Sequence, residues 1–389
     1  MSAQKLLNKP PAFHITLLLA TLAPLYIGSY QHRLHHPYGL PTTHQPPLQS
    51  VDTATAAASP DFIRNWLSVH VVEPFNPSAI AVYCNQTPVW DPNLVFNLAD
   101  ANGGIGNIRG NFLDFLFYAV EAGASVMLPG MATRSEADLS NVWASRGVFD
   151  LMFDEEWFLR AWRRACPQMG VYKPRPGKEM MEPVAGTYFP PSRRRDLDAG
   201  NSREGFREHF GSWLKQQDAG KGRGDGEGGM VLVNVGRTLW EVDTRSLSPG
   251  FRRNFGQLLR INPAIRRLAA MQSPHKPSTA HTPPLTVVSK HSLLPPQGLR
   301  DLEALTWDQQ ALVDYEVLQR ASVFGGFVKS SFSYNIAMTR AQWGEDRGRV
   351  VEPWRVLHEE IGVAFDDGFS RVVGRDGWHE ARIPRGMWP

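Results

Sequence analysis

Residues 94–128 of this chain, LVFNLADANGGIGNIRGNFLDFLFYAVEAGASVML, decide its fold. They open with an apolar run, residues 94–99, that is typical of a buried strand. After a glycine-rich turn, residues 107–122 place apolar side chains at the three- and four-residue spacing of a helix, which Gly123 ends. Residues 124–128 form a second apolar run. Strand, glycine turn, helix and strand in this order make one βαβ unit, so the sequence predicts an α/β fold.

The composition is that of an ordinary folded protein. Hydrophobic residues make up 42% of the chain and charged residues 20%, which is enough apolar material for a buried core. A length of 389 residues allows two domains with appendages. The net charge of +3 is small for this length, so we expect no nucleic-acid partner.

The chain after the βαβ unit divides at a linker, residues 272–284, which is rich in Pro and poor in apolar residues. Before the linker we expect helices over 149–166, a loop over 174–201, a loop over 220–229, a strand over 230–236 and an amphipathic helix over 251–271. After it we expect a strand over 285–290, a helix over 307–321, a strand over 323–328 and a helix over 331–342. The pattern implies a second α/β layer, and the tail over 343–389 receives no assignment.

The N-terminal segment is typical of a signal-anchor. Residues 13–30 are apolar and uncharged, and Lys5 and Lys9 precede them. The length is just sufficient for one membrane-spanning helix, and the basic flank predicts a cytosolic tail over 1–12 with the rest of the chain in the lumen of the ER or Golgi. Residues 31–78 lack a hydrophobic period and are expected to form a stem. A cleaved signal peptide is the alternative.

Two features agree with a lumenal location. Asn85-Gln86-Thr87 is an acceptor triplet for N-glycosylation. Cys84 and Cys166 are the two cysteines of the chain, and an oxidising compartment could join them. A pair of buried free thiols is the equal alternative.

The glycine-rich turn over residues 102–109 could bind a phosphate. Gly104 and Gly106 let the backbone approach a bulky ligand, and the helix that follows presents free N–H groups with partial positive charge. Arg109 could add a two-pronged contact to the phosphate. The glycine spacing does not match the dinucleotide-binding fingerprint. A tight structural turn with a surface arginine is the alternative of equal weight.

Ser330 and Ser331 mark a second helix start between a strand and a helix. Their hydroxyls could hold a diphosphate, although capping of the helix would by itself explain them. Asp314, in the preceding helix, would on its own be an exposed acid. Two helix starts that can each bind an anion, on two α/β layers, are what a nucleotide in a cleft would require.

Several blocks together resemble the fungal branch of the GDP-fucose protein O-fucosyltransferase-like family. They are GGIGNIRGN with EAGASVMLP, Phe153-Asp154, Cys166-Pro167-Gln168, and LTWDQQALVDYEVLQRASVFGGFVKSSFSYNIAMTR. The resemblance implies a GT-B-like architecture, in which Rossmann-like domains over 79–245 and 246–389 face one cleft. It also implies GDP-fucose as donor, a hydroxyl of a protein or glycan as acceptor, and no metal or cofactor.

The resemblance also implies roles for individual residues. Asn107 and Arg109 would lie where donor and acceptor meet, with Arg109 as the candidate catalytic residue. Asp314 would contact the guanine nucleotide, and Ser330, Ser331 and Phe332 would surround the diphosphate. The full set of expected donor-binding residues is Gly104, Gly106, Asn107, Arg109, Asp314, Ser330, Ser331 and Phe332.

One element of the family is missing from this sequence. Members carry a His-x-Arg on a strand of the second domain, and here the short linker over 272–284 occupies its place. The second domain is therefore expected to be abridged, and no general base is evident, since Asp100 is better explained as a turn residue. The alternatives are a catalytically inactive pseudoenzyme, a lumenal protein that binds a nucleotide-sugar or a partner, and a membrane-tethered scaffold.

Overall fold

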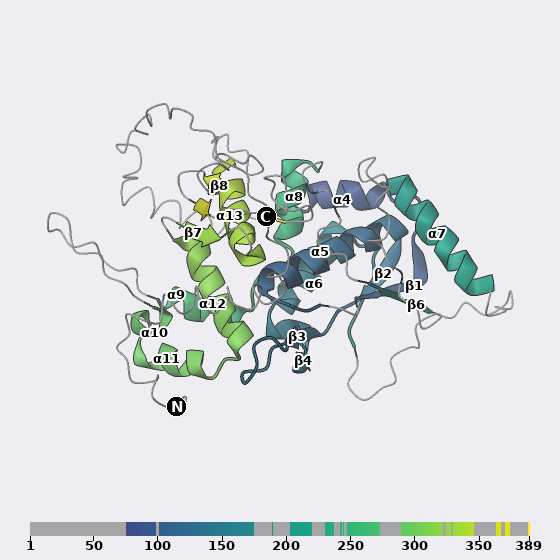
Figure 1. Ribbon diagram of the computed structural model, residues 1–389. Helices are drawn as coiled ribbons and strands as arrows, with labels where there is room; N and C mark the ends of the chain where they lie inside the picture. Colours follow the sequence, from purple (N-terminus) through teal and green to yellow (C-terminus); the bar gives the residue numbers. More distant parts are fainter. Residues whose placement is uncertain are drawn as a thin grey trace, which may run out of the picture.

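A computed structural model gives the arrangement of the chain (Figure 1). It describes residues 75–98, 101–174, 189, 203–219, 230–236, 242, 244, 247–272, 289–321, 324–327, 330–345, 363–366, 370–373 and 388–389. The expected signal-anchor and stem lie outside these residues, except for the end of the stem. Within the described part, no helix is both long enough and apolar enough to cross a bilayer.

A four-stranded parallel sheet forms the first layer, in the order β5-β2-β1-β6. Its central strand β1 pairs with β2 on one side and β6 on the other, so the strands on both sides of the glycine turn are neighbours. This is the parallel arrangement that the βαβ pattern predicts, and the fold is mixed α/β. The strands are β1 (Asp91–Leu98), β2 (Ala124–Met127), β5 (Val171–Tyr172) and β6 (Val231–Val235).

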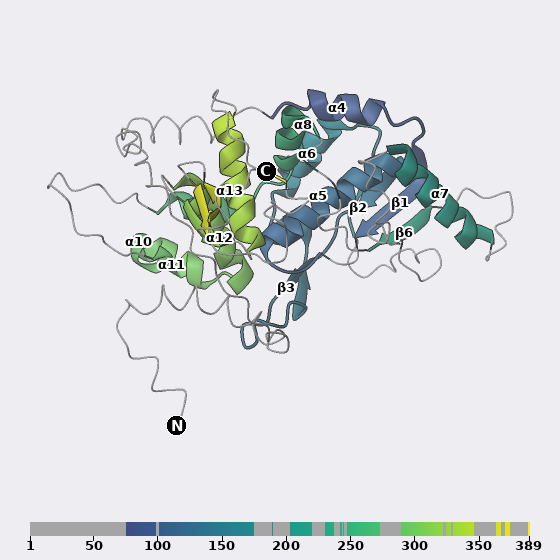
Figure 2. The same ribbon diagram turned by 45° about the horizontal axis from the view of Figure 1, so that its top comes forward.

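Helix α5 (Ile105–Ala122) connects β1 to β2 and lies between the sheet and the later helices (Figures 1 and 2). It is buried at 15 of its 18 residues. Gly123 ends the helix with φ of 67°, and a Cβ there would lie 2.0 Å from the carbonyl oxygen of Val89. Only glycine satisfies both conditions, so this residue fixes the turn into β2.

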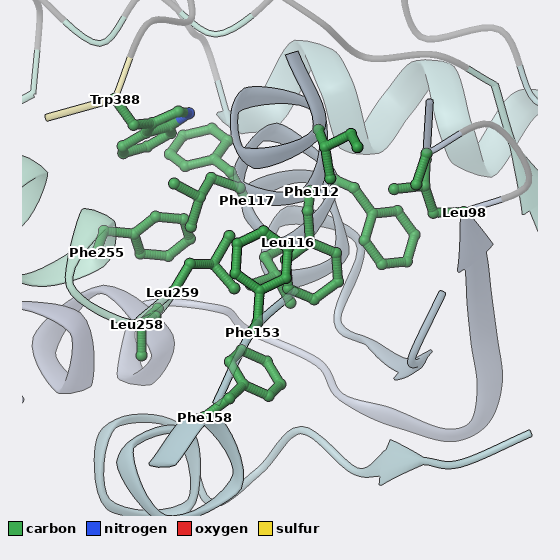
Figure 3. Close-up of a cluster of buried hydrophobic side chains, with 14 of the residues drawn as sticks. Leu98, Phe112, Leu116, Phe117, Phe153, Phe158, Phe255, Leu258, Leu259 and Trp388 are labelled. Carbon is green, nitrogen blue, oxygen red and sulfur yellow. The ribbon is translucent and has the colours of Figure 1, made fainter. Parts of the chain in front are cut away.

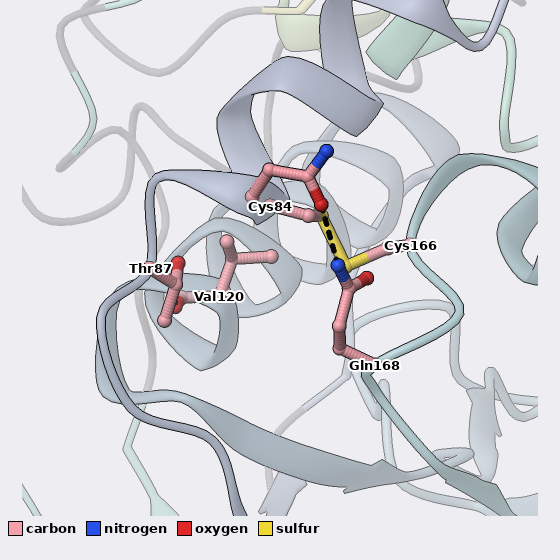
Figure 4. Close-up of a disulfide and its surroundings, with 6 residues drawn as sticks. Cys84, Thr87, Val120, Cys166 and Gln168 are labelled. Carbon is pink, nitrogen blue, oxygen red and sulfur yellow. Dashed lines mark hydrogen bonds between the residues drawn. A yellow bond between two sulfur atoms is a disulfide. The ribbon is translucent and has the colours of Figure 1, made fainter.

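Helices α4 (Ser78–Asn85) and α6 (Glu155–Ala165) are joined by a disulfide between Cys84 and Cys166 (Figure 4). The Cα atoms of the two cysteines are 5.7 Å apart, which is the usual spacing for a disulfide. Asp154 caps α6 by accepting a hydrogen bond from the Trp157 amide. Of the two alternatives for the cysteines, the structure has the paired one.

The expected single helix over 251–271 is wrong, because the structure has two helices there. They are α8 (Pro249–Gly256) and α9 (Pro263–Ala270). Pro263 cannot continue a helix from upstream, and Asn262 caps the new helix by accepting from the Ala264 amide. The expected strand over 285–290 is also wrong at its described end, since Lys290 begins helix α10 (Lys290–Leu293).

A second, three-stranded sheet has the order β7-β9-β8, with β7 parallel and β8 antiparallel to β9. Helices α12 and α13 accompany it on the side of the molecule away from β1 (Figure 2). Strands β8 and β9 lie in the tail over 343–389, where we predicted no element. The elements are α11 (Pro296–Glu303), α12 (Trp307–Arg320), β7 (Phe324–Phe327), α13 (Ser331–Glu345), β8 (Val363–Asp366) and β9 (Ser370–Val373).

Aromatic side chains fill the space around α5 (Figure 3). Phe112 packs against Phe158 with ring centroids 5.5 Å apart, and Trp388 packs against Phe255 at 4.7 Å. Each buried ring of this size contributes about 2–3 kcal/mol through removal of apolar surface from water. The buried core extends without interruption from the first sheet to the second.

Candidate functional site at the starts of helices α5 and α13

The starts of α5 and α13 lie against each other. A Cβ built on Gly106 would lie 2.6 Å from the carbonyl carbon and oxygen of Ser331 and 2.9 Å from the amide nitrogen of Phe332. Any larger residue at position 106 would overlap the backbone of α13. The structure therefore brings the glycine turn and the Ser-Ser-Phe segment together, although they are more than 200 residues apart in the sequence.

The glycine turn leaves the beginning of α5 without a side-chain cap. Gly103 has φ of 97°, and Gly104 is the N-cap residue in an extended conformation. The first turn of the helix contains no acidic residue. The side-chain oxygen of Asn107 is buried and has no hydrogen-bond partner. A helix start of this kind has amide groups and a partial positive charge to offer an anion.

Capping accounts for part of the serine segment. Ser330 Oγ accepts a hydrogen bond from the Ser333 amide at 3.3 Å, so Ser330 caps α13. Ser331 and Phe332 are half-buried, and the Phe332 ring meets Tyr315 edge-on at 5.7 Å. Ser333, which the sequence analysis did not single out, accepts a hydrogen bond from the Phe327 amide and ties β7 to α13.

Arg109 is a buried residue and not the surface arginine of the structural alternative. Its side chain is within the core, and its Nη1 and Nη2 atoms donate to the main-chain oxygens of Trp388 at 2.8 Å and Gly256 at 2.7 Å. Nη2 also donates to the oxygen of Pro389 at 2.5 Å. Burial lowers the pKa of Arg109 from its ordinary value. In this arrangement the guanidinium binds main-chain oxygens of α8 and of the Trp388-Pro389 segment.

Asp314 forms an ion pair with helix α10. Its carboxylate accepts a hydrogen bond from Lys290 Nζ of α10 at 2.8 Å. The next residue, Tyr315, points to the other side of α12, where its hydroxyl donates to Asn335 of α13. The structure thus brings Tyr315 to the neighbourhood of the candidate site, and Asp314 to α10.

An ion pair that the sequence analysis missed lies beside the glycine turn. Arg134 follows β3 (Met131–Thr133) in a hairpin with β4 (Ser145–Gly147), and its Nε is 3.3 Å from Asp308 Oδ1 at the start of α12. Its guanidinium also lies over the Trp307 ring at 5.1 Å. A Cβ at Gly104 would lie 3.9 Å from Arg134 Nη2. This arginine is therefore the positive charge nearest to the turn that the described contacts show.

Burial raises the pKa of the Asp308 carboxyl above its ordinary value, and the contacts from Arg134 lower it by a smaller amount. The Arg134 amide also donates to Asp308 Oδ2 at 2.7 Å. No local pattern marks Arg134. In the structure Thr306 and Gln309 form a capping box and Asp308 lies in the first turn of α12, but its partner Arg134 is 174 residues away in the sequence.

The glycosylation triplet has one exposed and one buried end. Asn85 is exposed and its side-chain oxygen accepts a hydrogen bond from Gln168 Nε2 at 2.6 Å. Thr87 is only 6% exposed, and its hydroxyl donates to the Val120 oxygen at 3.1 Å. The folded chain thus presents the asparagine but not the threonine hydroxyl.

Within the described residues, no group of three or more His, Cys, Asp or Glu side chains could hold a metal ion. Asp100 lies outside the described residues. Comparison of the chain with protein-family models, with curated proteins and with solved structures gives no match.

Proposed function

We propose that this protein binds GDP-fucose, with the diphosphate across the adjoining starts of α5 and α13. The observation that carries the proposal is the contact between Gly106 and the Ser331 backbone, because it sets two helix N-termini side by side. Each N-terminus contributes amide donors and a favourable electrostatic term of about 0.3–1 kcal/mol for one negative charge. A diphosphate carries enough charge to use both.

Arg134 supports the same assignment. A diphosphate over the glycine turn would come within reach of this guanidinium, because its ion pair with Asp308 is made at Nε while Nη2 lies on the side of Gly104. Arginine suits phosphate recognition because its planar fork matches two oxygens at once. In this proposal Arg134 takes the place of the arginine of the missing His-x-Arg.

The reaction that fits this donor is transfer of fucose to a hydroxyl of a protein or glycan. The bond between fucose C1 and the β-phosphate oxygen breaks, GDP leaves with the electron pair, and the acceptor oxygen forms the new bond to C1 as it loses its proton. Positive charge at the departing phosphate typically changes the rate by two to three orders of magnitude. The two α/β layers would form a GT-B-like pair of domains with an abridged second member, and residues 13–30 would anchor the chain as a type II protein in the ER or Golgi membrane.

A second candidate is a nucleotide-sugar-binding protein without transferase activity. The observation in its favour is the engagement of Arg109 by three main-chain oxygens, which leaves the expected catalytic arginine without a place at the donor. A transfer assay with radiolabelled GDP-fucose separates the two candidates. Release of GDP without added acceptor or with a glycoprotein mixture supports the enzyme, and donor binding without any GDP release supports the second candidate.

Donor binding is tested by thermal unfolding of the purified full chain with and without GDP. We expect GDP at 100 times its Kd to stabilise the protein by about 2.7 kcal/mol and to raise its melting temperature. Arg134→Gln should reduce the rise. Arg146→Gln is the matched control, since Arg146 stands in the same hairpin and also lies over a tryptophan ring, Trp143, at 5.4 Å. Equal effects of GDP on both variants, or no effect on the parent chain, would contradict the proposal.

A further inference from the structure

Trp388 and Pro389 occupy a site in the core that is built from distant parts of the chain. The Trp388 ring is fully buried and lies 4.7 Å from Phe255 and 6.3 Å from Phe117, measured between ring centroids (Figure 3). Its indole Nε1 donates to Asp114 Oδ1 of α5 at 2.7 Å. The site therefore has an aromatic slot with a carboxylate acceptor at one end.

The main chain of this dipeptide is bound as specifically as its ring. The Trp388 oxygen accepts two hydrogen bonds, from Arg109 Nη1 at 2.8 Å and from Asn335 Nδ2 of α13 at 2.7 Å. The Pro389 oxygen accepts a hydrogen bond from Arg109 Nη2. A Cβ built on Gly256 would lie 2.0 Å from this Pro389 oxygen. Gly256 thus leaves the space that Pro389 needs.

These contacts are complementary to the side-chain and main-chain groups of a Trp-Pro segment. Asp114 requires a ring with an N–H donor, the phenylalanine rings require a flat apolar group, and Arg109 with Asn335 requires two main-chain oxygens at a fixed separation. The partners come from α5, α8 and α13, so the bound dipeptide also connects the first layer to the second.

We propose that this pocket is a binding site for a Trp-Pro segment, which the chain's own Trp388-Pro389 occupies, and that its occupation opposes binding of the donor. The second part rests on the proposed function. Arg109 lies three residues after Gly106, in the first turns of the helix whose start would hold the diphosphate. While it donates to Trp388 and Pro389 its guanidinium cannot turn to a phosphate. In this proposal Arg109 joins Arg134 at the diphosphate only after the dipeptide has left, so ligand and dipeptide compete for Arg109.

The pocket itself is tested with a chain shortened by Trp388 and Pro389, in the absence of nucleotide. We expect the synthetic peptide Gly-Met-Trp-Pro to bind this chain in saturable fashion by isothermal titration, and not to bind the full chain. The peptide Gly-Met-Phe-Pro should bind about tenfold more weakly, because it lacks the N–H that a charged acceptor receives. Equal affinities for the two peptides, or no binding to a shortened chain that melts cooperatively, would overturn the proposed pocket.

Opposition to the donor is tested with GDP on the same chains. Removal of the dipeptide should tighten GDP binding on the order of tenfold, since Arg109 no longer has to be released from Trp388 and Pro389 before GDP binds. Added Gly-Met-Trp-Pro should reverse the gain. If the shortened chain does not fold, Trp388→Phe in the full chain replaces it, because this change keeps an aromatic ring in the slot while it deletes the bond to Asp114 and part of the ring packing. Equal GDP affinity with and without the dipeptide overturns the competition, whereas absence of GDP binding in both, with the peptide still bound, refutes the proposed function alone.

Discussion

At the scale of single residues, Gly106 has the most direct effect on the candidate site. Replacement by alanine would set a Cβ 2.6 Å from the Ser331 carbonyl, a distance at which the backbone must move. We expect Gly106→Ala to lower the free energy of unfolding by about 1–3 kcal/mol, the usual cost of overpacking. The measurement is urea-induced unfolding followed by tryptophan fluorescence.

Gly211→Ala is the control for this prediction. Gly211 lies inside helix α7 (Arg203–Ala219), and a Cβ there would have no atom within 4 Å. Alanine should stabilise that helix by about 0.5–1 kcal/mol, because glycine is the poorer helix former. A Gly106→Ala variant as stable as the parent chain would show that the two helix starts do not touch as described.

The buried carboxylate of Asp308 predicts a dependence of stability on pH. Since burial raises its pKa, the folded chain holds the proton at pH values where the unfolded chain has lost it. The contribution of the Asp308 carboxyl to the free energy of unfolding therefore falls as the pH rises above the ordinary aspartate pKa, which is about 3.9. Between pH 4 and neutrality, the parent chain should lose stability relative to Asp308→Asn. Chemical unfolding at a series of pH values measures the difference, with exposed Asp301→Asn as the control for loss of one charge. An increase with pH would contradict the raised pKa of Asp308.

At the scale of elements, the break between α8 and α9 depends on Asn262. Its side-chain oxygen accepts from the Ala264 amide at 2.8 Å, so it caps α9. Its Nδ2 donates to the Asp150 oxygen at 2.6 Å, which joins α9 to the 3-10 helix η4 (Phe149–Leu151). We expect Asn262→Ala to cost about 1–2 kcal/mol in thermal or chemical unfolding, the range for loss of an N-cap. Ser248→Ala, which removes the single 3.3 Å cap of α8, should cost less. The reverse order would show that the cap is not what separates the helices.

Local patterns predict most of the elements and fewer of their contacts. The period of the sequence predicted β1, α5, β2, β6, α12 and α13, because each of these has its own apolar run or helical spacing. It gave one helix where Pro263 makes two, since the apolar spacing continues across the break. The positions of Arg109 and Arg134 depend on Trp388 and Asp308, which are 279 and 174 residues distant, and no local pattern contains such partners.

At the scale of the whole molecule, the disulfide between Cys84 and Cys166 constrains the first layer. It joins residues that are 82 positions apart, and closure of a loop of that size stabilises the folded state by roughly 4 kcal/mol in the chain-entropy description. Reduction should therefore lower the melting temperature of the parent chain by several degrees. The double variant Cys84→Ser, Cys166→Ser should melt at the reduced value and be insensitive to reductant. Equal melting with and without reductant in the parent would mean that the bond contributes nothing.

Helix α5 has almost no face in contact with water along its length, and it meets the first sheet on one side and α12 and α13 on the other. Division of the chain between residues 272 and 289 would therefore leave an uncovered apolar strip on both fragments. Each fragment would then associate through this apolar surface, and the surface of the other fragment is the one that fits it. The two layers therefore have to be kept together when the chain is engineered. An exchange of one layer between related chains succeeds only if the surface that faces α5 is exchanged with it.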